Sequence, residues 1–163
     1  GISGEEAIPT SQAWLTYDEA NLYIAIDNTV SKTQPLKKGS TWGQDDAVEI
    51  AIRNPAIKTS PIIVLRGYPK GQYESSTESG ISDALAKKAG EGVKYSAKIV
   101  DATRWVAEMQ IPFASLGIDP AKQAKLAFNL TVRKTAESLW IMWCGTNGYS
   151  WAVENAGFLE LSK

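Results

Sequence analysis

The 163-residue sequence contains no histidine and a single cysteine, Cys144. Histidine is the usual general base at neutral pH and the commonest zinc, copper and haem ligand. Its absence removes Ser-His and Cys-His nucleophilic sites and the commonest ligand of these three metal groups. Paired carboxylates can hydrolyse glycosides without histidine, but no such motif stands out in this chain. The composition therefore favours a binding function over an enzymatic one.

Charge excess and long apolar runs are missing as well. The 17 basic and 18 acidic residues give a formal net charge of -1 and form no long run of one sign, so nucleic acids and anionic membranes are not expected partners. No apolar run approaches the roughly 20 residues of a membrane span. Residues 1–4 lack the basic and apolar regions of a signal peptide, and we expect a piece excised from a larger protein.

Short segments of alternating apolar and polar residues recur along the chain, a pattern typical of strands with one buried face. The length suits one core, so residues 1–163 are predicted to form a single domain. Little helix is expected beyond residues 82–88, behind a serine cap, and one turn at 113–116. The fold class predicted is all-β, an antiparallel sandwich of the jelly-roll or immunoglobulin-like kind. The predicted strands are residues 14–16, 22–27, 46–53, 62–66, 93–99, 105–111, 126–133, 139–144 and 157–161.

Residues 42–54 are the most informative stretch. Trp42 stands in a polar loop that leads into the predicted strand at 46–53. In that strand the branched apolar residues share one face, while Glu49 and Arg53 lie on the other. Because antiparallel sheets commonly pack one face and leave the other free, we expect Glu49 to point away from the core. The free face would carry a carboxylate, a guanidinium and a nearby indole.

The six tryptophans divide by their neighbours. Two of them, Trp42 and Trp151, stand among polar and glycine-rich residues, and we predict that they contact a ligand. The other four lie in apolar predicted strands and are expected in the core. These four are Trp14, Trp105, Trp140 and Trp143.

The order of several segments, covering roughly residues 14–161, resembles the family 9 carbohydrate-binding modules. That family belongs to a wider group of sandwich domains that bind sugars or haem. The segments that carry the resemblance are residues 18–26, Trp42 with 45–50, 105–113 with 116–117, 126–130, and Trp151 with 157–161.

The resemblance implies a sugar clamped between Trp42 and Trp151, with polar contacts from Glu49, Arg66 and Asn147. A pyranose ring has an apolar C–H face that packs on an indole, and its hydroxyls need charged or amide partners when they leave water. The implied protein is a non-catalytic, secreted or cell-surface module and a monomer. It would be an accessory domain of a glycoside-active enzyme, and its partner would be a plant or algal cell-wall oligosaccharide or polysaccharide.

No cofactor is required by this interpretation. The amino-terminal segment that the family links to calcium, rich in Asp and Gly, is largely missing here. A structural calcium ion stays open as an alternative, since Asp45 and Asp46 could either cap the loop or hold a cation.

Two other functions stay open from the sequence. A haem-binding electron-transfer domain could use Met109 or Met142 as one axial ligand, but the partner histidine does not exist in this chain. A structural or protein-interaction domain could keep the fold without a sugar site.

Overall fold

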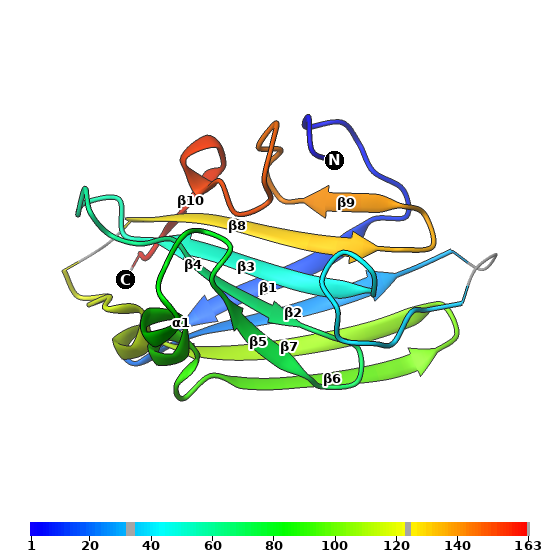
Figure 1. Cartoon of the computed structure of the whole chain (residues 1–163), viewed down its shortest axis with the longest axis horizontal. Coiled ribbons are helices and arrows are strands. Elements are labelled where there is room, and N and C mark those ends of the chain that lie inside the picture. The colour runs from blue at the N-terminus through cyan, green and yellow to red at the C-terminus, as the bar shows by residue number, and fades with distance from the viewer. Residues whose placement is uncertain (32–34, 123–124, 163) are drawn as a thin grey trace.

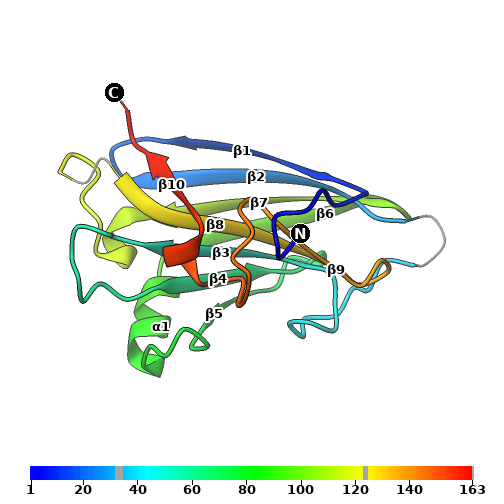
Figure 2. The ribbon, with the colours of Figure 1, turned by 90° about the horizontal axis from the view of Figure 1, so that it is seen from above.

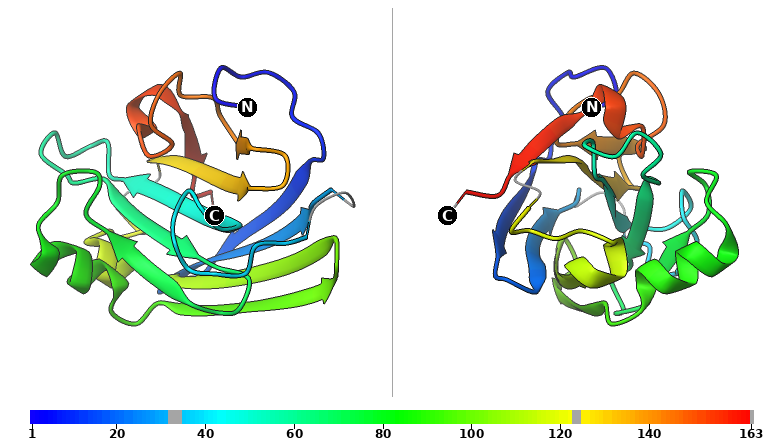
Figure 3. Two further views of the ribbon diagram at one scale, coloured as in Figure 1. Left: turned by 45° about the vertical axis from the view of Figure 1, so that its right-hand side comes forward. Right: turned by 90° about the vertical axis from the view of Figure 1, so that its left-hand side faces the viewer.

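Two antiparallel sheets stacked face to face make up the molecule (Figures 1 and 3). The computed structural model describes residues 1–31, 35–122 and 125–162. The first sheet, called sheet A, has the strand order β1-β2-β7-β6. Its strands are β1 Ser11–Tyr17, β2 Asn21–Thr29, β7 Arg104–Pro112 and β6 Lys94–Asp101.

The second sheet, called sheet B, has the order β10-β8-β3-β4-β5, and β9 also pairs with β8. Antiparallel β10 and β9 pair with opposite ends of β8, so one edge of that strand is covered along most of its length. The strands of sheet B are β3 Ala47–Arg53, β4 Ile63–Gly67, β5 Tyr73–Ser76, β8 Lys125–Lys134, β9 Leu139–Met142 and β10 Gly157–Glu160.

The core lies between the sheets and follows the alternation of the sequence. In β2 every second residue is buried, and the same holds for β7. Trp105 of β7 is fully buried, together with Ile50 of β3 and Phe128 of β8. Burial of such side chains stabilises the fold by roughly 1.5–3 kcal/mol each. The predicted all-β antiparallel sandwich is confirmed.

Helix is confined to short pieces. The α-helix α1 spans Asp83–Gly90, and the hydroxyl of Ser82 accepts a hydrogen bond from the Leu85 N–H at 3.3 Å, which confirms the predicted serine cap. The 3₁₀ turns are η1 Phe113–Leu116 and η2 Val153–Asn155. No helix among the described residues is long and apolar enough to span a membrane.

Two of the tryptophans expected in the core are exposed instead. Trp14 is 56% exposed and Trp143 is 53% exposed, whereas Trp105 is buried as predicted. Trp14 lies on the edge strand β1, opposite Ala25 on the outer face of sheet A. Trp143 follows the end of β9. An apolar pattern assigns side chains to a face, but it cannot show that a strand lies at the edge of its sheet.

The outer face of sheet B is not free, which corrects the expectation for β3. Glu49 does lie on that face, yet it is only 1% exposed, and residues 47–52 are all buried. The chain after β9 folds back over the sheet, coloured orange to red in Figure 2. The side-chain amide of Asn129 in β8 holds this segment by donating to the Cys144 and Ser150 carbonyls, both at 3.1 Å. A loop therefore closes a face that the strand pattern predicts to be open.

Lys134, at the end of β8, ties the two sheets together. Its side chain is fully buried, and the ammonium donates to the carbonyls of Pro9, Thr10 and Thr29 at 2.7, 3.0 and 2.6 Å. Three carbonyls match the three donors of an ammonium group. Burial lowers the pKa of Lys134 to about 8, although Glu137 and Asp46 oppose this shift.

We expect the contribution of Lys134 to the melting temperature to become more favourable as the pH rises from about 8 to about 9.5. The folded pKa lies below the unfolded one, so over this range the unfolded chain binds more protons and stability rises with pH, by at most about 1.4 kcal/mol per unit for one proton. Melting curves of the wild type and Lys134→Met across this range measure the effect. A difference between the two proteins that does not change with pH would contradict it.

Candidate functional site

The site is built around a buried carboxylate in the middle of sheet B. Glu49 of β3 accepts hydrogen bonds from two directions, and each of its oxygens has a partner. The Arg66 Nε, on the neighbouring strand β4, donates to Oε2 at 2.8 Å. The Ser150 hydroxyl, in the loop after β9, donates to Oε1 at 2.5 Å. One carboxylate thus joins a strand and a distant loop.

Arg66 is 3% exposed and continues the network outward. Its Nη2 donates to Glu78 at 2.6 Å, and its Nη1 lies 3.7 Å from a carboxylate oxygen of Glu74. The guanidinium carbon also lies 4.2 Å from the centre of the Trp42 ring. A desolvated arginine held over an indole attracts the ring and fixes its orientation. Three carboxylates surround one guanidinium, so this group of residues carries a net negative charge.

Burial and pairing act in opposite directions on this ion pair. Burial raises the pKa of the Glu49 carboxyl, and the Arg66 guanidinium and Ser150 hydroxyl limit the rise. Burial would lower the pKa of Arg66, but hydrogen bonds with Glu78 and Glu49 outweigh it and raise that pKa instead. Arg66 therefore keeps its charge, and this charge stabilises the ionised form of the buried Glu49 carboxyl.

The loop that carries Trp42 is held by the two aspartates that follow it. The Asp45 carboxylate accepts from the backbone N–H groups of Gly39 and Thr41 at 3.1 and 3.0 Å. Asp46, fully buried, accepts from the N–H groups of Lys37 and Thr135 at 2.6 and 2.9 Å. Both aspartates thus organise the loop, in line with the capping role that the sequence allowed for them.

The loop that carries Trp151 is held from beneath and within. Asn129 contacts it from β8, and the Thr146 hydroxyl donates to the Tyr149 carbonyl at 2.9 Å. The rings of Tyr149 and Trp151 stack with centroids 5.0 Å apart and planes 8° apart. Trp151 also packs on a small apolar cluster that includes Ala51 of β3. The loop therefore presents a fixed pair of aromatic rings.

A pocket of about 200 Å³ opens between these two loops on the outer side of sheet B. Trp42 and Trp151 both line it, so the structure brings the two predicted ligand-contacting tryptophans to one place. Glu49 and Arg66 lie beneath the pocket rather than on its surface. The described residues that line it are Ile2, Trp42, Glu78, Trp140, Met142, Gly148, Tyr149, Ser150 and Trp151.

Asn147 lies at the turn of the Trp151 loop. Its backbone adopts the left-handed conformation, with φ of 55°, and its N–H donates to the Ile2 carbonyl at 2.9 Å. Asparagine tolerates this conformation better than most residues. Asn147 is not one of the described residues that line the pocket, and its side chain is exposed. Its backbone hydrogen bond to Ile2 joins the amino-terminal segment to the loop.

Among the lining residues that the sequence does not predict as ligand contacts, three carry a charge or an aromatic ring: Glu78, Trp140 and Tyr149. Glu78 follows β5, in a stretch that reads as loop. Tyr149 is 72% exposed. Its position two residues before Trp151, in a turn that contains glycine, is the sequence feature that could have indicated a ligand contact. Trp140 lies in β9, where it was expected in the core, but it is half-buried and its ring meets Trp42 edge-on at 5.2 Å. Pairing of β9 with the end of β8 brings it there.

No group of three or more Cys, Asp and Glu side chains that could hold a metal ion occurs among the described residues. The carboxylates of Asp45 and Asp46 are already engaged by backbone N–H groups. In this structure both aspartates therefore take the capping role of the two that the sequence allows.

We expect a calcium chelator to leave the melting temperature unchanged. A metal ion that binds only the folded state would stabilise it, and removing that ion would lower the melting temperature. Melting curves with and without excess EDTA make the measurement, and re-addition of calcium is the control. A drop of several degrees that calcium reverses would show a structural ion.

Fold and pocket together define a class of protein, a β-sandwich binding module with an aromatic pocket on the outer side of one sheet. The family model described as "Carbohydrate family 9 binding domain-like" matches residues 3–162. The chain therefore belongs to this family of carbohydrate-binding modules, which are in general non-catalytic.

Solved structures agree with this assignment at the level of the fold. A family 9 carbohydrate-binding module from Caldicellulosiruptor kristjanssonii in complex with glucose matches with a TM-score of 0.70 and 16% identity, over 98% of this chain and 80% of that one. A module from the same organism in complex with cellotriose matches with a TM-score of 0.68 and 18% identity, over 94% and 76% of the two chains. No curated protein matches the sequence.

Proposed function

We propose that the pocket between Trp42 and Trp151 binds one sugar unit of an oligosaccharide without catalysing a reaction. The observation that carries the proposal is that both indoles, 109 positions apart in the sequence, line one open pocket whose rim holds a carboxylate, Glu78. Indoles pack on the C–H face of a pyranose, and a carboxylate accepts from its hydroxyls.

The size of the pocket supports a single sugar unit. Pockets for drug-sized ligands usually have volumes of roughly 300–1,000 Å³. The volume here is about 200 Å³, below that range. A small ring with hydroxyls around its rim matches both the volume and the mixed apolar and polar surface. The similar modules solved in complex with glucose and cellotriose make glucose-based sugars the first ligands to test.

Glu49 and Arg66 serve this site from below. Arg66 underlies Trp42, and Glu49 holds both Arg66 and Ser150, the residue next to Trp151. Their role in the proposal is to position the two indoles and to orient Glu78 toward the pocket. Asn147 contributes by shaping the turn that carries Tyr149 and Trp151.

The proposal extends to the biological setting. A non-catalytic sugar-binding module of this kind fits a secreted or cell-surface protein in which a neighbouring domain acts on glycosides. Its partner would be a plant or algal cell-wall glycan, which it would bind as a monomer. Membership of the carbohydrate-binding family supports this setting.

Titration calorimetry with glucose, cellobiose and cellotriose tests the proposal directly, and a glycan array widens the search to other sugars. Glucose and cellobiose are expected to bind at one site per chain, and cellotriose should bind this pocket little more tightly than cellobiose if the pocket holds one sugar unit. Absence of binding to every sugar tested would instead favour a structural or protein-interaction domain.

A further inference from the structure

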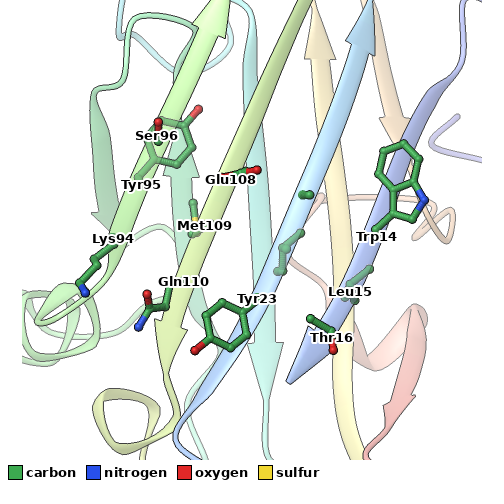
Figure 4. Close-up of a pocket in the computed structure, with 12 residues that line it drawn as sticks. Trp14, Leu15, Thr16, Tyr23, Lys94, Tyr95, Ser96, Glu108, Met109 and Gln110 are labelled. Atoms are coloured by element: carbon green, nitrogen blue, oxygen red, sulfur yellow. The ribbon is translucent and has the colours of Figure 1, made fainter. Parts of the chain in front are cut away.

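The outer face of sheet A carries a hollow that the proposed pocket does not use (Figure 4). It has a volume of about 530 Å³ and runs across all four strands of the sheet. Since the pocket lies on the outer side of sheet B, the hollow faces the opposite side of the molecule.

Strand register explains the shape of the hollow. Trp14, Ala25, Glu108 and Ser96 lie opposite one another on β1, β2, β7 and β6, and so form one row across the sheet. Neighbouring strands are about 4.8 Å apart, so Trp14 and Glu108 stand on either side of the methyl group of Ala25, with roughly 10 Å between their backbones. A small residue between two large ones leaves room for a ligand.

The next row closes one side of the hollow. It consists of Thr16, Tyr23, Gln110 and Lys94 on the same four strands. The Tyr23 hydroxyl donates to the Asp18 carboxylate at 2.7 Å, which holds the ring in place. A large ring therefore stands beside the hollow as well as at its end.

Trp14 is a large apolar side chain left open to solvent on this face. Its side chain is 56% exposed, and no ring stacking or cation–π contact engages it among the described residues. Outer faces of antiparallel sheets ordinarily carry polar side chains, and an exposed indole beside polar groups is a common feature of binding surfaces.

The polar groups around the hollow are also unused. At the far end of the same face, Arg104 and Asp27 bond each other at 2.6 and 2.9 Å. Around Ala25 the described residues form no such pair. No hydrogen bond or ion pair engages the polar side chains there, which are those of Lys94, Ser96, Glu108 and Gln110.

We propose that this hollow is a second carbohydrate-binding site, in which a sugar ring packs on Trp14 above Ala25 and its hydroxyls bond to Glu108, Ser96 and Gln110. The groups present one positive and one negative charge, Lys94 and Glu108, so they favour an uncharged ligand over an anionic one. The hollow crosses the whole sheet, and its occupant is a segment of a neutral oligosaccharide several sugars long.

Indole N–H signals in a ¹⁵N-labelled sample can report on both sites in one spectrum. The Trp14 signal belongs to the hollow, and the Trp42 and Trp151 signals belong to the pocket. Titration with cellohexaose, xylohexaose and laminarihexaose is expected to move the Trp14 signal with at least one of them. If the pocket signals alone move, the proposed function stands and the second site is overturned. If the Trp14 signal alone moves, the second site stands and sugar binding at the pocket is overturned.

Two variants separate this site from a general change in the protein. Trp14→Ala should weaken binding at the hollow by about tenfold or more, because it removes the stacking surface. Ala25→Leu should do the same by filling the space, on a strand that tolerates a larger apolar residue. Neither should change the response of Trp42 and Trp151. Trp143→Ala, which removes an exposed indole outside both sites, is the matched control.

Self-association through Trp14 is the competing explanation of its exposure. Sedimentation of the wild type and Trp14→Ala over a range of concentrations distinguishes the two. A dimer that Trp14→Ala disrupts, or a Trp14 signal that none of the three oligosaccharides moves, would overturn the proposal.

Discussion

Replacing Trp42 or Trp151 with Ala is expected to weaken sugar binding by about 1.5–3 kcal/mol, which is roughly tenfold to more than a hundredfold. Each substitution removes an indole from the same small pocket and with it the apolar surface on which a pyranose face would pack. Titration calorimetry with the tightest-binding mono- or disaccharide gives the two affinities.

Trp143→Ala is the matched control for these variants, because Trp143 is an exposed indole that does not line the pocket. Its affinity should equal that of the wild type. Melting curves identify any variant whose fold is damaged, a real concern for Trp151, which packs on Ala51. If both tryptophan variants fold normally and bind as tightly as the wild type, the sugar site lies elsewhere.

Arg66→Met should destabilise the protein by about 3–5 kcal/mol. The substitution keeps most of the buried apolar volume but leaves the Glu49 carboxylate buried, with Ser150 as its remaining described partner. An uncompensated buried charge costs this much because solvation is lost and nothing replaces it. Urea unfolding at pH 7 measures the loss.

The second substitution Glu49→Gln should restore much of that stability. It removes the charge, and the side-chain carbonyl of Gln can still accept from Ser150. The pH dependence offers an independent check. Loss of Arg66 leaves burial to raise the pKa of Glu49, so the deficit of Arg66→Met should shrink as pH falls toward and below the unfolded pKa of Glu, where the carboxylate is protonated. A deficit that is the same at pH 4 and pH 7 would show that lost packing, rather than charge, is responsible.

Alternation along the chain predicts the sandwich well, because burial between two sheets imposes a period of two on each strand. The positions of β2, β3, β7 and β8 follow directly from it. Strand β5 escapes detection because its four residues, Tyr73–Ser76, include no apolar alternation. Its pairing with β4 comes from register with a neighbour, which a local pattern does not contain.

The site was only partly predictable for a similar reason. Trp42 and Trp151 stand out because they interrupt polar, glycine-rich segments. Glu49 stands out as a carboxylate on a strand, but its burial depends on a loop 101 positions away that folds over it. Contacts between residues so far apart in the sequence are set by the whole topology. The strand pattern therefore predicts which face Glu49 lies on, but not that a loop buries that face. Glu78 and Tyr149 enter the pocket through the same folding back of loops.

The carboxylate of Glu49 bears on how the binding preference of this module could be redesigned. It reaches the support of Trp42 through Arg66 and the loop of Trp151 through Ser150, and both Glu49 and Arg66 lie in strands. The rim residues Glu78 and Tyr149, in contrast, lie in loops and are largely exposed. A library that varies positions 78 and 149 while keeping 49, 66 and 150 would change which sugar hydroxyls are bound, while the bonds of Glu49 to Arg66 and Ser150 stay in place.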